Sequence, residues 1–163
     1  YRRDPDGRVT TLAVGLGAAE AAQLVGDTLW LLSGDALYTM PADGGPLTAR
    51  ASGLRWARAL AMSEDARPQW VDHYDGALWR LPSSVPQARV TGLDGPTGLA
   101  TAHGVTAIAT DDGLWLGHGD DWTQHLPGRR VSVALTDRRA WVLDRDAGTV
   151  TSIPLPGAPK TVE

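Results

Sequence analysis

The sequence predicts an all-β fold: a β-propeller of about four and a half four-stranded blades, part of a larger six- or seven-bladed propeller. The first observation is a short segment that we call the anchor, which begins with an apolar residue and in most repeats ends in Pro four residues later. It recurs at intervals of 36, 41, 36 and 36 residues. Its lead residues are Tyr1, Leu37, Leu78, Leu114 and Val150. The second is an Asp-Gly pair between apolar runs in successive repeats, at 6–7, 43–44, 75–76 and 112–113. Such pairs favour tight hairpins because these turns need φ > 0, and repeats of this length match propeller blades.

Each repeat is expected to contain four strands, a to d in chain order. Strand c holds the anchor, which reads LYTMP at 37–41 and LWRLP at 78–82. Strand d follows it, as in WTQHL at 122–126. Strand b precedes it, and its aligned position is expected to hold Trp30, Trp70, Ile108 and Trp141. Trp141 is therefore predicted to be buried between blades, because repeated aromatic residues are commonly packing residues.

Strand a is the least obvious of the four strands. It is centred on small residues, namely Ala22, Ala61, Ala100 and Ala134, which suit the crowded centre of a propeller. GAAEAAQL at 17–24 has helical propensity. Its aligned segments in the other repeats do not, so the repeat predicts a strand there.

The repeats divide residues 1–163, a single propeller region, into blades at 15–53, 54–92, 93–128 and 129–163. Residues 1–14 are expected to supply strands c and d of an earlier blade, whose strands a and b are missing from the sequence. Because the chain starts at Tyr1 rather than Met, an upstream segment is expected to have been removed. Open sheet edges recruit partners, so we expect either further blades upstream or self-association through the open blade edges.

Composition narrows the functional classes. The 15 basic residues are outnumbered by 19 acidic ones, for a net charge of −4, whereas a nucleic-acid-binding protein would show a basic surplus. The absence of cysteine excludes disulfides, thiolate metal sites and a cysteine nucleophile. No apolar stretch approaches the ~18 residues needed to insert in a membrane.

Three segments resemble a known type of propeller blade. GPTGLATAHGVTAIATDDGLWL at 95–116 resembles an NHL-type blade, and WVDHYDGALWRLP at 70–82 and YRRDPDGRVT at 1–10 are similar to the second half of one. The wider group includes gluconolactonase-like and streptogramin-lyase-like enzymes, receptor sensor domains and binding scaffolds. Gluconolactonase-like metal sites use Glu, Asp and Asn, whereas this chain has no Asn and only three Glu, which counts against a metal lactonase.

No pattern predicts catalytic residues, a metal site or a cofactor. His73, His103, His118 and His125 share no metal-like spacing. The serines lack a nucleophile-elbow pattern. Acidic segments such as DHYDG at 72–76 lack a full set of calcium ligands and are expected to be Asx-type turns.

One face of the propeller is the candidate binding surface. Because strands alternate in direction, the d-to-a connections and the b-to-c turns fall on the same side. The candidate binding residues there are Arg55, Trp56, Arg58, His73, Tyr74, Arg129, Arg130 and Arg145. Arg and aromatic residues are typical of binding hot spots. The opposite face has fewer candidates, including Glu64, Asp65, Arg67 and His103.

Two functions follow from this distribution. The first is a non-enzymatic sensor or scaffold module, extracytoplasmic or secreted, that recognises a protein or small anionic ligand through this face. The alternative is part of a propeller enzyme of lyase or lactonase type, with catalytic groups partly outside this chain. A convergent set of carboxylates and His at the channel mouth would distinguish the second from the first.

Overall fold

The computed structural model describes residues 2–3, 5–13, 16–33, 35–130 and 132–155, which form seventeen strands and no helix. Blade 1 contains β3 (Ala19–Val25), β4 (Thr28–Ser33), β5 (Ala36–Pro41) and β6 (Thr48–Ser52). Blade 2 contains β7 (Ala57–Met62), β8 (Pro68–Asp72), β9 (Ala77–Arg80) and β10 (Gln87–Val90). Blade 3 contains β11 (Gly98–Ala102), β12 (Val105–Ala109), β13 (Gly113–His118) and β14 (Asp121–Pro127). Blade 4 contains β15 (Ser132–Leu135), β16 (Arg139–Asp144) and β17 (Thr149–Pro154).

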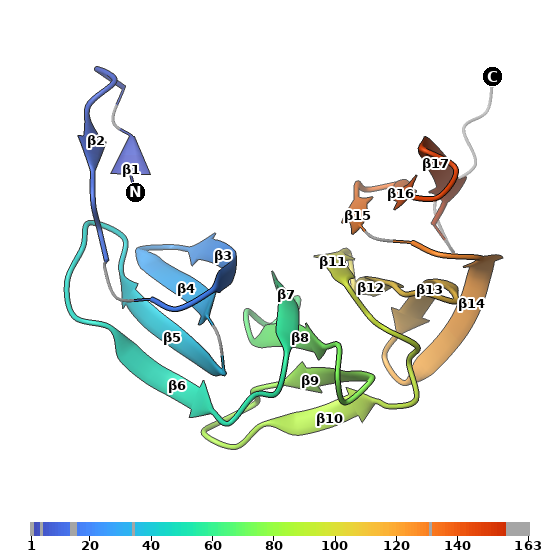
Figure 1. Cartoon of the computed structure of the whole chain (residues 1–163), viewed down its shortest axis with the longest axis horizontal. Helices are drawn as coiled ribbons and strands as arrows, with labels where there is room; N and C mark the ends of the chain where they lie inside the picture. The colour runs from blue at the N-terminus through green and yellow to red at the C-terminus, as the bar shows by residue number, and fades with distance from the viewer. Residues whose placement is uncertain (1, 4, 14–15, 34, 131, 156–163) are drawn as a thin grey trace.

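Every sheet pairs its strands antiparallel in chain order. The four sheets stand around an arc, with β3, β7, β11 and β15 innermost and next to one another (Figure 1). A separate hairpin, β1 (Arg2–Arg3) with β2 (Val9–Thr10), stands beyond blade 1. The predicted propeller fold is confirmed, and the segment with helical propensity forms strand β3. The segment that would hold the fourth strand of blade 4 falls on 156–163, outside the described residues.

The core lies between the blades rather than inside one barrel. Strand β8 shows how neighbouring side chains serve different interfaces. Trp70 packs with Leu32 of blade 1, and Val71 packs with Ile108 of blade 3. Successive residues of a strand point to opposite faces of its sheet. Adjacent apolar residues in strand b therefore supply two interfaces at once.

The prediction that Trp141 is buried between blades is wrong. Its side chain is 43% exposed, whereas its neighbour Val142 is 1% exposed and packs against blade 3. The pairing with strand c gives the reason. The lead residue Val150 lies opposite Leu143, so Val142 occupies the place that Trp70 occupies in blade 2. The sequence alignment of strand b, which matched Trp141 with Trp70, is therefore shifted by one residue. A one-residue shift moves a side chain to the other face of the sheet.

The same shift affects Trp30, which is half-buried and matches Gln69 rather than Trp70. In blade 4 the shift leaves Trp141, Leu143 and Val150 exposed on one side of the sheet. Self-association through the open blade edges stays a prediction. The described part of the chain contains no helix that could span a membrane.

Candidate binding face

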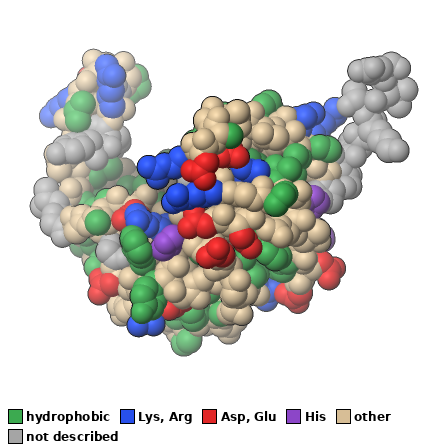
Figure 2. All heavy atoms as spheres, turned by 45° about the vertical axis from the view of Figure 1, so that its right-hand side comes forward, with side chains coloured by type: hydrophobic (Ala, Val, Ile, Leu, Met, Phe, Trp, Pro, Cys, Tyr) green, Lys and Arg blue, Asp and Glu red, His purple; other side chains and the backbone are tan. Residues whose placement is uncertain are grey.

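Backbone hydrogen bonds bring the d-to-a connections and b-to-c turns together. The His73 N–H donates to the Trp56 carbonyl at 3.0 Å, and the Asp111 N–H donates to the Asp94 carbonyl at 2.8 Å. The Arg130 N–H donates to the Thr110 carbonyl, also at 2.8 Å. We call this surface the loop face; it comprises the connections at 53–56, 91–97 and 128–130 and the turns at 73–76, 110–112 and 145–148. Figure 2 shows basic and acidic side chains lying against one another across one face of the molecule.

Asp72, at the end of β8, organises two segments of the loop face. Its side chain is 1% exposed. Oδ2 accepts the N–H groups of Arg55 at 2.9 Å and Trp56 at 3.2 Å. Oδ1 accepts those of Tyr74 and Asp75, both at 3.1 Å. The predicted Asx-type turn is confirmed. The sequence did not reveal that the same carboxylate also holds the incoming connection.

The two segments that Asp72 holds carry two contacts between an arginine and an aromatic ring. The Arg55 guanidinium lies 4.4 Å from the centre of the Tyr74 ring, and that of Arg58 lies 4.4 Å from the centre of the Trp56 ring. His73 meets Trp56 edge-on, with the ring centres 4.7 Å apart. Trp56 is 43% exposed and Tyr74 is 66% exposed. Five of the eight predicted site residues therefore form one group, although Arg58 belongs to β7 rather than to the connection where the sequence analysis placed it.

Arg55, Arg58 and Arg129 are each paired with a less exposed acid. Arg55 Nη1 lies 3.3 Å from Asp75 Oδ1, and the Arg55 side chain is 60% exposed whereas that of Asp75 is 28% exposed. Arg129 Nε lies 2.9 Å from Asp111 Oδ1, and the Arg129 side chain is 45% exposed whereas that of Asp111 is 34% exposed. Arg58 similarly pairs with Glu20 of β3. In these three pairs the arginine is more exposed than the acid, whereas in the Arg130–Asp144 pair the acid is the more exposed partner, at 19% against 12%.

Gly95 connects the aromatic group to the next blade. Its φ is +52°, a conformation that favours glycine. An added Cβ would lie 2.5 Å from Asp111 Oδ2 and 3.1 Å from His73 Cε1. Asp111 in turn accepts from Arg129. The contacts at Gly95 and Asp111 therefore link His73 of blade 2 to Arg129 in the connection that leads to blade 4.

Arg130 and Arg145 differ from the other predicted site residues. Arg130 is 12% exposed, is ion-paired with Asp144 and donates to the Pro127 carbonyl at 2.7 Å. It therefore holds the connection in place rather than presenting a free cation. Arg145 lies in the turn between β16 and β17 and has no hydrogen bond or ion pair within the described residues.

Asp144 makes the blade 4 turn sensitive to acid. Hydrogen bonds from the Ala147 N–H first, and then the charge of Arg130, hold the pKa of Asp144 below its ordinary value of 3.8. A carboxyl whose folded pKa is lowered stabilises the fold above its unfolded pKa, and this contribution is lost as pH falls through the folded pKa. Asp144→Asn is expected to flatten the fall in melting temperature below about pH 4, which thermal melts between pH 7 and 2.5 would measure. An unchanged slope would contradict this.

A second concave region lies on the opposite face. Between blades 2 and 3 lies a cavity of about 480 Å³ that is open to solvent and is lined among others by Gln69, Arg80 and Trp122. The sequence analysis did not select these residues, because they come from separate repeats. Gln69 had one available signal, since it is a polar residue directly before the apolar pair Trp70 and Val71 of strand b. Among the described residues, no group of three or more His, Cys, Asp or Glu is arranged to hold a metal.

No protein-family model matches the chain, and no curated protein matches it by sequence. Solved structures match its fold. A chain of the nidogen/laminin complex has a TM-score of 0.78 at 15% identity, over 93% of this chain and 65% of that chain. A gluconolactonase from Xanthomonas campestris has a TM-score of 0.72 at 18% identity, over 94% of this chain and 64% of that chain. A streptogramin B lyase has a TM-score of 0.64 at 12% identity, over 89% of this chain and 57% of that chain.

The computationally designed Ika4 protein matches at nearly its full length. Its TM-score is 0.71 at 15% identity, over 90% of this chain and 96% of that chain. The present chain thus spans 57% to 65% of the three natural neighbours named above. Their identities of 12% to 18% establish the fold alone. The chain has the β-propeller fold that gluconolactonase-like and streptogramin-lyase-like proteins share, which confirms the predicted resemblance at the level of the fold.

Proposed function

We propose that the chain is a non-enzymatic binding module that recognises an anionic segment of a protein, or a small anionic ligand, through the loop face. The observation that carries this proposal is the exposed stack of Arg55 on Tyr74 and Arg58 on Trp56. Arg and aromatic side chains contribute most of the binding energy in many interfaces. Here they are held in place before any ligand arrives, which lowers the entropic cost of binding.

The sign of the charge favours an anionic partner. Arg55, Arg58 and Arg129 are each more exposed than their acidic partners. A carboxylate or phosphate approaching the surface would meet guanidinium groups first, and these bind such groups through paired hydrogen bonds. The chain as a whole carries a net charge of −4, so this attraction is local.

The fold does not choose between binding and catalysis, because propellers of both kinds are among the structural neighbours. The proposal therefore rests on the loop face itself. Arg55 and Arg129 are each ion-paired with a neighbouring acid, and the rings of Trp56 and Tyr74 are open to solvent.

Binding of fluorescently labelled acidic peptides, each containing one aromatic residue, tests the proposal by fluorescence polarisation. Arg55→Ala and Trp56→Ala are each expected to weaken binding by about 1–2 kcal/mol, with little change in melting temperature. Binding should also weaken as salt rises from 50 to 500 mM, since exposed charges are screened (Debye length about 10 Å at 0.1 M).

The control is a double variant on the opposite face, Arg67→Ala with His103→Ala, both of which are exposed. It should bind the peptides as the natural chain does. A basic peptide of matched length should not bind. If the control loses binding while Trp56→Ala retains it, the loop face is not the binding surface.

A further inference from the structure

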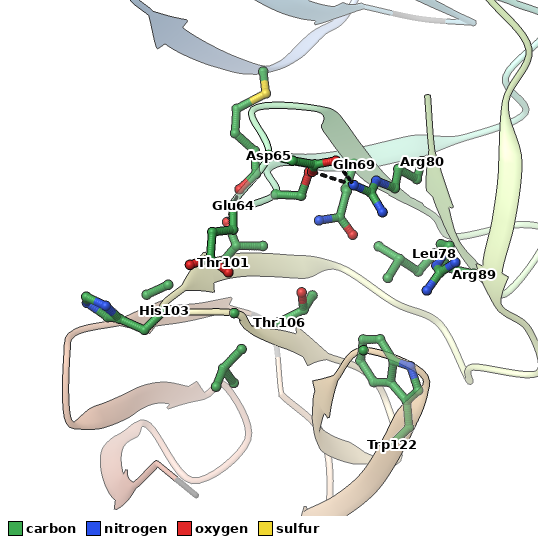
Figure 3. Close-up of a pocket in the computed structure, with 16 residues that line it drawn as sticks. Glu64, Asp65, Gln69, Leu78, Arg80, Arg89, Thr101, His103, Thr106 and Trp122 are labelled. Carbon is green, nitrogen blue, oxygen red and sulfur yellow. Dashed lines mark hydrogen bonds and ion pairs between the residues drawn. The ribbon is translucent and has the colours of Figure 1, made fainter. Parts of the chain in front are cut away.

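The cavity between blades 2 and 3 is independent of the loop face. It opens on the side of the a-to-b and c-to-d turns and has a volume of about 480 Å³. That volume is within the range of ~300–1,000 Å³ typical of small-molecule sites. Figure 3 shows its lining converging from both blades: Gln69 and Arg80 from strands β8 and β9, Thr106 from β12, and Trp122 from β14.

Gln69 is the residue that marks this cavity as a site. Its side chain is 6% exposed, yet it has no hydrogen bond within the described part of the chain. It lies opposite Arg80 in the β8–β9 pairing, so both side chains stand on the face of blade 2 that looks toward blade 3. Its amide is not among the fully enclosed unpartnered side-chain groups of the described residues, because it lines the open cavity. A ligand in the cavity could meet both its donor and its acceptor.

The charged groups of the cavity balance one another. Two arginines and two acids line it, namely Arg80, Arg89, Glu64 and Asp65. Arg80 is ion-paired with Asp65 (Figure 3). Arg89 of blade 2 is ion-paired with Asp120 in the turn before β14, which ties the two blades together. Both guanidinium groups are ion-paired, and Arg80 keeps a buried Nε–H without a partner among the described residues, so the cavity is suited to a polar ligand without net charge that can accept a hydrogen bond.

Trp122 supplies a flat apolar surface beside these polar groups. A Cβ added to Gly117 would lie 2.5 Å from the indole ring, so the ring packs directly on the backbone of β13. The rest of the ring lines the cavity. The Thr106 side chain also lines it and has no hydrogen bond among the described residues.

We propose that this cavity binds a neutral saccharide of one or two rings. Hydroxyl groups both donate and accept hydrogen bonds, which is what the unpartnered amide of Gln69 requires. A sugar ring also has a C–H face that can lie against an indole, as Trp122 provides. Paired arginines and acids add further donors and acceptors without selecting a charge. This inference goes beyond the proposed function and concerns a different face.

Saturation-transfer NMR followed by calorimetry tests the proposal, with glucose, galactose, mannose, maltose and cellobiose as probes against the full chain. At least one is expected to bind in the millimolar range or tighter. Gln69→Met, which keeps the volume but removes the amide, is expected to weaken that binding about tenfold or more. It should leave the melting temperature nearly unchanged, because the amide makes no hydrogen bond within the described residues. A purely structural Gln69 would lower the melting temperature instead.

Gln87→Met is the matched control, because Gln87 is an exposed glutamine on β10 of the same blade. It should not change saccharide binding, and neither should Arg55→Ala on the loop face, so the two functional proposals can fail separately. Thr106→Val serves as a second variant should Gln69→Met not fold, and a loss of affinity is again expected. Saccharide binding that survives Gln69→Met, no binding by any probe, or a preference for glucuronate or sulfate would overturn the proposal.

Discussion

Asp72→Ala is expected to destabilise the protein by about 3 kcal/mol, because four backbone N–H groups lose their acceptor in a buried place. Two of these N–H groups belong to the connection that enters blade 2, and two belong to the turn between β8 and β9. The side chain is 1% exposed, so water cannot replace it without opening the loop face. Urea denaturation followed by circular dichroism measures the loss.

Two further variants separate this role from a general effect of charge. Asp72→Asn keeps one carbonyl oxygen but turns the other acceptor into a donor, so it should lose an intermediate amount of stability. Asp94→Ala removes an exposed acid from the same face and should change stability by less than about 0.5 kcal/mol. Equal losses in Asp72→Ala and Asp94→Ala would show that Asp72 does not organise the two segments.

The repeat in the sequence was enough to predict the propeller, because blade spacing and Asp-Gly turns are local signals. It also overrode the helical propensity of residues 17–24, which form strand β3. The sequence does not define the register of strand b in the same way. Apolar residues occupy both faces of these strands, so the alternation that normally fixes register is absent. Tryptophan does not mark one position of strand b, because Trp70 and Trp141 lie on different faces of their sheets.

For the candidate surfaces too, the sequence predicted some features, and others depend on tertiary packing. Strand alternation alone predicted that Arg55 and Tyr74 share a face, and a cation–aromatic contact joins them. The exposure of each arginine could not be predicted, since it depends on which acid lies beneath it; Arg130 is largely covered by its pairing with Asp144. The cavity of Gln69 and Trp122 joins residues from two blades, 53 positions apart in the sequence, and only the packing of those blades creates it.

Trp70→Ala is expected to cost about 3–5 kcal/mol, as truncations of large buried aromatic residues do. Trp70 is 0% exposed and fills the space between blades 1 and 2. Its indole N–H has no hydrogen-bond partner among the described residues, which places the expected loss near the lower end of that range. Trp141→Ala should cost less than about 1 kcal/mol, because that side chain is 43% exposed.

The two truncations remove the same side chain, so their difference isolates burial. Urea denaturation of both variants, with Trp70→Leu as a milder replacement in case the alanine variant does not fold, gives the comparison. A loss at Trp70 that exceeds the loss at Trp141 by about 2 kcal/mol or more supports the register in which Val142, not Trp141, faces the neighbouring blade. Similar losses at the two positions would mean that Trp141 is packed against apolar surface after all, and the pairing of Val150 with Leu143 would have to be reconsidered.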